Sequence, residues 1–169
     1  DIDNRGVFDL ASTGGVVPST GGGNVNNVGG VIRSSGGAAA EFSVPVNNVD
    51  GRFDTTNGDL TLAAGGTHSG ALQTLGGPVR FTGGTHSFAP GATIPGDLEL
   101  AGATLNVAND PTLTGTLDWI SGNIAGTPNS GATGGRLNVT SAGTVTFAGA
   151  ANRSLVDATI DNQLSLIHI

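Results

Sequence analysis

A five-residue phrase of glycine, any residue, apolar, any residue, apolar recurs along the middle of the chain at an almost constant interval. Its copies begin at Gly58, Gly77, Gly96, Gly115 and Gly135, so they lie 77−58=19, 96−77=19, 115−96=19 and 135−115=20 residues apart. A fixed period of this length, with alternation inside each copy, is typical of a β-solenoid that forms one coil per repeat. We therefore expect an all-β fold built as a single-stranded parallel β-helix, with about 19–21 residues and three short strands per coil.

Stacking of the coils turns this repeat into columns of side chains, because coils lie about 4.8 Å apart and equivalent residues lie above one another. The two apolar positions give the inward columns Leu60, Val79, Leu98, Leu117, Leu137 and Leu62, Phe81, Leu100, Trp119, Val139. We expect the central members Leu98, Leu100, Leu117 and Trp119 to be buried structural residues. The Trp119 indole should lie near a corner, where its N–H can reach a carbonyl group.

The glycine that opens each phrase is expected at a corner of the coil, where the chain turns between flat faces. A corner of this kind needs a positive φ, which a residue with a Cβ atom resists. The sequence therefore predicts positive φ for most of Gly58, Gly77, Gly96, Gly115 and Gly135. If these glycines have ordinary β dihedrals instead, their alternative role is to relieve crowding between coils.

The rest of the chain carries weaker repeats of the same kind. Asn4, Asn27 and Asn48 occupy equivalent places in an Asn-rich phrase, 27−4=23 and 48−27=21 residues apart. We expect looser coils over residues 1–57, regular coils over 58–163 and amide ladders between stacked asparagines. Further strands are expected at 67–69, 85–88, 104–107, 123–125 and 144–147, and a third set near Leu72, Ile94 and Leu113. Three strands per coil give a triangular cross-section, and the missing hexapeptide pattern of left-handed helices favours the right-handed form.

The last six residues, 164–169, do not continue the repeat. Leu-Ser-Leu-Ile-His-Ile resembles the in-frame translation of a mosaic-end adapter from transposon-based sequencing libraries, so we expect a non-native tail on one continuous β-helix segment, 1–163. Uncovered coil edges and this apolar tail predict end-to-end self-association of the isolated 169-residue chain, reduced when the tail is deleted.

Composition excludes several classes of partner and site. The net charge is −7 and lysine is absent, so no basic stripe is present for a nucleic acid. The chain has no cysteine, which excludes disulfides and thiolate zinc sites. No apolar run is long enough for a membrane span. We expect an extracellular location, stacking on neighbouring repeats of the same chain, and no cofactor.

Three phrases resemble repeats of known surface proteins. Residues 47–51, Asn-Asn-Val-Asp-Gly, 83–87, Gly-Gly-Thr-His-Ser, and the stretch 115–126 resemble the filamentous-haemagglutinin-like and autotransporter-like β-helical repeat regions of large bacterial surface proteins. The resemblance implies an adhesin-like, secreted or surface-anchored stalk, with host-cell or extracellular polysaccharides or proteins as ligands. Such repeats contribute no catalytic residue.

His68 and His86 are the candidate metal ligands. They recur in two Gly-Gly-Thr-His-Ser phrases and are expected to stack in the column later occupied by Leu105, Ile124 and Val145. A metal ion needs three or four ligands, and no third ligand is evident there. The favoured interpretation is a hydrogen-bonded core pair, with a shared metal as the alternative.

Carboxylates are the candidate groups for an enzyme, since β-helical lyases and hydrolases use clustered acids. Glu99 and Asp118 should be stacked and exposed on an outer face with Arg80 beside Glu99, whereas Asp59 and Asp97 lie two coils apart. A solvated face explains them more simply, and exposed threonines are good strand formers. We expect a non-catalytic stalk or binding scaffold, with no catalytic residue. The alternative is a fragment of a β-helical polysaccharide lyase or glycoside hydrolase.

Overall fold

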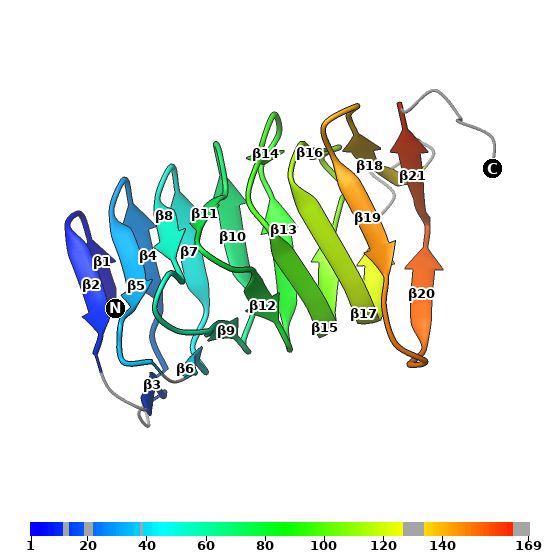
Figure 1. The fold of residues 1–169 in the computed structure, drawn as a ribbon. Coiled ribbons are helices and arrows are strands. Elements are labelled where there is room, and N and C mark those ends of the chain that lie inside the picture. The colour runs from blue at the N-terminus through cyan, green and yellow to red at the C-terminus, as the bar shows by residue number, and fades with distance from the viewer. Residues whose placement is uncertain (12–13, 19–21, 38, 127–133, 164–169) are drawn as a thin grey trace.

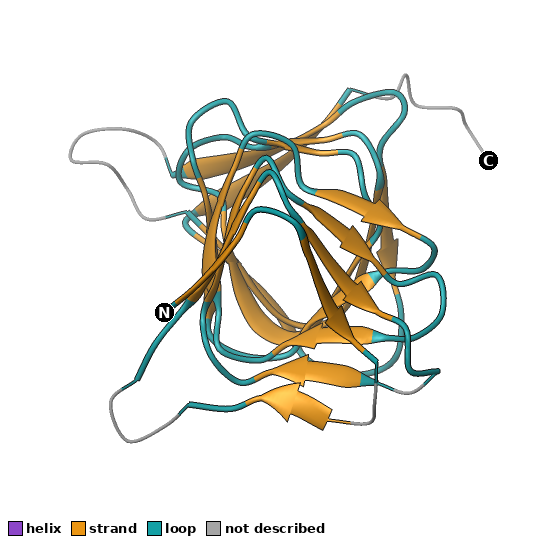
Figure 2. Ribbon diagram, turned by 90° about the vertical axis from the view of Figure 1, so that its left-hand side faces the viewer, coloured by secondary structure: helices purple, strands orange, loops and turns teal. Residues whose placement is uncertain are grey.

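The computed structural model describes residues 1–11, 14–18, 22–37, 39–126 and 134–163 of the chain. Throughout these residues the regular structure is β-strand, wound into a parallel β-solenoid of about seven turns, with β1 (Ile2–Asn4) and β21 (Ala158–Asn162) at opposite ends of the stack (Figure 1). Seen from the N-terminal end, successive strands follow one another clockwise as the chain recedes, so the winding is right-handed (Figure 2). The expected fold class is confirmed. The tail 164–169 lies outside the described residues.

The first face of the solenoid contains the repeated phrases that begin at Gly58, Gly77, Gly96 and Gly115. Its strands are β3 (Gly14–Val16), β6 (Ala40–Phe42), β9 (Leu60–Leu62), β12 (Val79–Phe81), the first halves of β15 (Leu98–Asn106) and β17 (Thr116–Ala125), and β19 (Thr144–Phe147). All neighbouring pairs are parallel.

The second face follows along the chain. Its strands are β1 (Ile2–Asn4), β4 (Val25–Val28), β7 (Val46–Val49), β10 (Gly66–Ser69), β13 (Thr85–Phe88), the second halves of β15 and β17, and β20 (Arg153–Val156). β15 and β17 run through the corner between the first two faces, and Gly102 (φ 123°) and Gly122 (φ 91°) lie at their bends. These two long strands join both faces into one 13-stranded sheet.

The third face consists of two four-stranded sheets. One contains β2 (Val7–Leu10), β5 (Val31–Ser34), β8 (Arg52–Asp54) and β11 (Gln73–Leu75), and the other contains β14 (Thr93–Ile94), β16 (Thr112–Leu113), β18 (Gly135–Val139) and β21 (Ala158–Asn162). A single bridge between Ala71 and Thr93 connects them. The cross-section is therefore triangular, as expected (Figure 2).

The apolar core occupies the axis, and the central columns are confirmed. Val79 pairs with Leu60 and Leu98, and Leu98 pairs with Leu117. Phe81, Leu100 and Trp119 follow one another in the second column. The four predicted structural residues are at most 3% exposed: Leu98, Leu100, Leu117 and Trp119. The Trp119 Nε1–H donates to the carbonyl of Gly122, 3.3 Å away at the corner, as predicted.

The prediction is wrong for the last member of each column, Leu137 and Val139. Leu137 and Val139 belong to β18 on the third face, where Val139 pairs with Leu113. The places predicted for Leu137 and Val139, beside Leu117 and Trp119, are occupied by Val145 and Phe147. The interval from Leu117 to Val145 is therefore 145−117=28 residues. Residues 144–147 are accordingly a first-face strand, not the second-face strand that was expected. A strand with one buried side shows the same alternation on any face, so the phrase identifies the strand but not its face.

The explanation of the repeated glycines is also wrong. Positive φ occurs at none of Gly58, Gly77, Gly96, Gly115 and Gly135. A Cβ atom on Gly96 would lie 2.6 Å from the backbone nitrogen of Thr74, and Cβ atoms on Gly115 and Gly135 would overlap the carbonyls of Gly96 and Val107. These three glycines therefore relieve crowding between coils.

Positive φ occurs instead at other places in the coil, among them the bends between the first and second faces and the corner between the second and third faces. Gly29, Asp50, Gly70, Asp110 and Asp157 have φ between 47° and 70° at the latter corner. Glycine and aspartate both tolerate the left-handed conformation better than most residues. The turns that need this conformation thus follow the first-face and second-face strands, and the glycine that opens each repeated phrase is not among them.

Candidate functional site

The second face carries two rows of polar side chains, one pointing outward and one into the interior. The outward row, in strand register, is Asp3, Asn26, Asn47, Thr67, Ser87 and Asn106. The inward row begins with Asn4, Asn27 and Asn48 and continues to His68. The two rows arise from alternation along each strand, because neighbouring residues point to opposite sides of the sheet. We refer to them as the outer row and the inner ladder.

The inner ladder is a chain of buried amides. Asn4 Nδ2 donates to Asn27 Oδ1 and Asn27 Nδ2 donates to Asn48 Oδ1, both at 2.8 Å. Asn48 Nδ2 then donates to the carbonyl of Gly51 at 3.0 Å. A Cβ atom on Gly51 would lie 2.6 Å from Asn48 Oδ1, so glycine is needed where the corner covers the ladder. The predicted amide ladder is confirmed, and its bonds join successive coils through the interior.

His68 and His86 meet inside the solenoid, two residues out of the predicted register. His68 pairs with Asn48 and Phe88, whereas His86 pairs with Gly66 and Leu105, so the expected shared column is wrong. The rings reach each other across this offset. His68 Nε2 lies 3.1 Å from His86 Nδ1, and the residues are 1% and 0% exposed.

Aromatic rings surround the pair. Phe81 stacks on His86 with ring centroids 3.7 Å apart and planes 6° from parallel. Phe88 packs against His68 at 5.2 Å in a tilted arrangement. These contacts fix both imidazoles within the apolar core, where a charged ring is poorly solvated.

Both imidazoles are neutral at physiological pH. Burial lowers the pKa of His68 from 6.5 to about 3, and repulsion from a charge on His86 adds to the effect. Burial also lowers the pKa of His86 to about 4, although backbone groups of Leu62 and Gly83 oppose this shift. His68 Nδ1 and His86 Nε2 are buried without a hydrogen-bond partner. Whichever ring donates in the shared bond, one N–H and one lone pair of the pair remain unsatisfied.

The geometry favours the hydrogen-bonded core pair over a metal site. The facing nitrogens are already bonded to each other, and a protein metal ion takes three or four ligands. Among the described residues, no group of three His, Cys, Asp or Glu side chains could hold a metal ion.

The outer row is a polar surface whose side chains are hydrogen-bonded to one another along the solenoid axis. Asn26 Nδ2 donates to Asp3 Oδ1 at 2.8 Å, and Asn47 Nδ2 donates to Asn26 Oδ1 at 3.0 Å. Thr67 continues the row, because its hydroxyl donates to Asn47 Oδ1 at 2.9 Å. Ser87 and Asn106 make a weaker contact of 3.4 Å, and Ala125 then interrupts the row. The surface presents amides and hydroxyls at the spacing of the coils.

The carboxylates of the first face are less exposed than expected. Arg80 Nε lies 2.6 Å from Glu99 Oε1 and its Nη2 lies 3.2 Å from Oε2, so the pair is bidentate. The Glu99 side chain is 13% exposed because neighbours in adjacent coils cover it, and Asp118, one coil further, is half-buried. The expected order Arg80, Glu99, Asp118 is confirmed. Asp59 and Asp97 are exposed and separated by the β12 coil.

A further ion pair on the third face was missed in the sequence. Arg33 Nε contacts Asp54 Oδ2 at 2.9 Å. A hydrogen bond from Thr56 is the main cause that lowers the Asp54 pKa, with Arg33 contributing and desolvation opposing. The Asp54 side chain is 9% exposed. Arg33 and Asp54 lie 21 residues apart, one coil, so the coil length was the signal that could have linked them.

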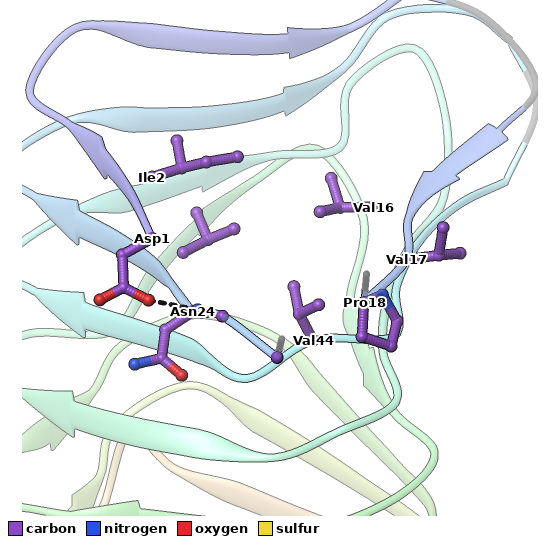
Figure 3. A pocket seen from close by; sticks show the side chains of 10 residues that line it. Asp1, Ile2, Val16, Val17, Pro18, Asn24 and Val44 are labelled. Carbon is purple, nitrogen blue, oxygen red and sulfur yellow. Dashed lines mark hydrogen bonds between the residues drawn. The ribbon is translucent and has the colours of Figure 1, made fainter. Parts of the chain in front are cut away.

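Apolar pockets lie at the two ends of the described stack. Ile2, Val16, Val17 and Val44 line the N-terminal one, where Asp1 accepts a hydrogen bond from the Asn24 backbone (Figure 3). The C-terminal one is lined by Val139, Gly143, Thr144, Val145, Phe147, Ile160 and Asn162. Both expose the cross-section of the core, which other coils bury in the middle of the stack.

The described chain thus offers a bonded polar face, a buried imidazole pair and two apolar ends. It contains no helix long and apolar enough to span a membrane, as far as the described residues extend. Comparisons with models of known protein families, with curated protein sequences and with solved structures gave no significant match.

Proposed function

We propose that this chain is a non-catalytic, adhesin-like segment of a secreted or cell-surface bacterial repeat protein, serving as a rigid stalk or binding scaffold. The observation that carries the proposal is the unbroken parallel pairing on the second face, from β1 through β15 and β17 to β20. In a solenoid each coil contacts only its neighbours, so continuous pairing produces a rod that lengthens with each repeat.

Interactions on three levels make this rod stiff. The apolar columns fill the axis, the inner ladder joins asparagines of successive coils, and Arg80 joins β12 to Glu99 of β15 on the outside. Buried polar groups that are bonded in one register oppose sliding, because a slipped coil would leave them unpaired. A spacer that holds a binding surface away from a cell needs this resistance of its coils to sliding.

The outer row is the surface we assign to ligand contact. Its side chains are polar, and Asp3 and Thr67 are exposed. Extracellular polysaccharides and proteins offer hydroxyl and amide groups that can bond to such a row. An acidic chain without cysteine suits the same extracellular setting.

Binding assays test the proposal. The chain should be immobilised and exposed to soluble polysaccharides and to intact cells, beside a variant with Thr67→Arg and Asn106→Arg in the outer row. Arg136→Ala on the third face is the control, because it leaves the outer row intact. The proposal predicts binding that the second-face variant loses and the control keeps.

The enzyme alternative has its own observation, since Glu99 and Asp118 lie in register on adjacent strands. Glu99 is already held by Arg80, which lowers its availability as an acid or base. Release of reducing or unsaturated sugars that Asp118→Asn abolishes would contradict the proposed function and support a lyase or hydrolase.

A further inference from the structure

The buried histidine pair divides two chemically different parts of the interior. On its N-terminal side, His68 follows the amides of Asn27 and Asn48 in register. On its C-terminal side, His86 is followed by Leu105 and then Ile124. The pair therefore lies where the inner ladder ends and an apolar column begins, near the middle of the described stack.

Among the described residues, no carboxylate acts on either ring to compensate a proton, and Asp54 of β8 on the third face is already paired with Arg33. The described strands β7, β9, β10 and β13 contain no carboxylate or guanidinium group. Arg80 of β12 and Glu99 of β15 point outward and bind each other. Asp50, the acid nearest in sequence to β7, is exposed at the corner against Gly70. An imidazolium at His68 or His86 would be a buried charge without a counter-ion, which is among the costliest states in a protein interior.

We propose that the His68–His86 pair is an acid-sensitive joint, at which the coils of β10 and β13 open in mild acid while the coils on either side stay wound. Opening exposes both rings to water, where each accepts a proton that the closed core excludes. The buried nitrogens without partners, His68 Nδ1 and His86 Nε2, gain water at the same time. This joint adds to the proposed stalk a place where the rod yields when the surroundings acidify.

The direction of the pH effect follows from proton linkage. Above about pH 6.5 the rings are neutral in both the closed and the open state, so pH has no effect through them. Below that value the open state binds protons that the closed state excludes, because burial holds the closed pKa values near 3 and 4. Closed coils therefore lose stability as the pH falls from about 6.5 towards 4. With two protons, the opening constant should rise about a hundredfold between pH 7.5 and 5.5.

Hydrogen exchange measured by mass spectrometry tests the joint on the full chain. Exchange rates at pH 7.5, 6.5 and 5.5 are corrected for the intrinsic effect of pH and compared among strands. We expect protection to fall about a hundredfold in β10 and β13, and to stay nearly constant in β4, β5 and the first half of β17. Unchanged protection in β10 and β13 would overturn the proposal, and equal loss in all strands would show global unfolding without a joint.

Two variants and one spectrum make the test specific. His68→Asn with His86→Leu replaces each ring by the side chain of its register neighbour, Asn48 or Leu105, and should abolish the pH effect. His86→Leu alone should leave about a tenfold effect from one proton. His168→Gln removes the other imidazole of the chain and should keep the wild-type profile. If the double variant does not fold, the NMR chemical shifts of the imidazole nitrogens in the wild type test the proposal instead. Titration of either buried ring near pH 6.5 in the folded state would refute it.

Discussion

Replacing Leu100 by alanine should remove a large part of the stability of the central coils. Leu100 is 0% exposed and stacks in register between Phe81 and Trp119. The substitution removes three buried carbon groups, each worth roughly 0.8 kcal/mol, so the transfer contribution alone is about 2.4 kcal/mol. A cavity adds to this cost when the neighbours cannot collapse into it.

The neighbours of Leu100 are held in place. Phe81 stacks on His86, and the Trp119 indole is bonded to the carbonyl of Gly122. We therefore expect Leu100→Ala to lower the free energy of unfolding by about 3–4 kcal/mol, within the usual range for buried leucine. Urea unfolding followed by circular dichroism measures this change.

Leu75→Ala is the matched control, because it removes the same atoms from a leucine that is 48% exposed in β11. Its effect should stay below about 1 kcal/mol. Equal effects of the two substitutions would refute the inward register of the repeated phrase. A changed slope of free energy against urea would indicate an altered denatured or native state instead of a simple cavity.

Three other perturbations address the crowding, the charge and the tail. Gly115→Ala should destabilise the solenoid by more than about 1 kcal/mol, because its Cβ would overlap the Gly96 carbonyl. In Gly77→Ala the Cβ would make only an ordinary contact of 3.8 Å with Thr55 Oγ1, so this substitution should be neutral or stabilising in the same urea assay. The lowered pKa of Asp54 stabilises the fold above its unfolded value near 3.8, so this contribution should disappear as the pH falls below that value. Asp54→Asn should flatten that part of the acid unfolding curve, and an unchanged curve would rule out the contribution. Deleting 164–169 should reduce self-association in light scattering without loss of β signal; a monodisperse monomer of the longer chain would refute the open-edge argument.

The sequence was sufficient to predict strand type, burial and winding. Alternation inside each phrase reflects burial of one side of a strand, so the positions of Leu98 and Leu100 followed directly. The constant interval of 19 reflects one complete coil, so the pairing of Arg80 with Glu99 followed as well.

Other features depended on geometry that alternation does not record. The phrase at Gly135 has the same alternation of apolar residues as the others but forms a third-face strand, β18. It does so because β18 is the next strand after the second-face half of β17, less than one coil further along the chain. The role of Gly115 depends on how closely the preceding coil approaches it, which a single repeat cannot show. His68 pairs with Phe88, two residues from His86, so the repeat does not place the two histidines side by side. Their contact depends on side chains long enough to reach across this offset.

The account depends most on a rigid stack of coils in one register, and spin-label distances test it directly. The chain has no cysteine, so pairs can be introduced cleanly on the second face: Asp3 with Thr67, with Asn106 or with Val156. These positions are three, five and seven strands apart in the register of that face. At about 4.8 Å per strand, the account predicts narrow distributions centred near 14, 24 and 34 Å, allowing for the label length. Distances that fail to rise linearly, or distributions that broaden from pair to pair at neutral pH, would contradict a rigid solenoid.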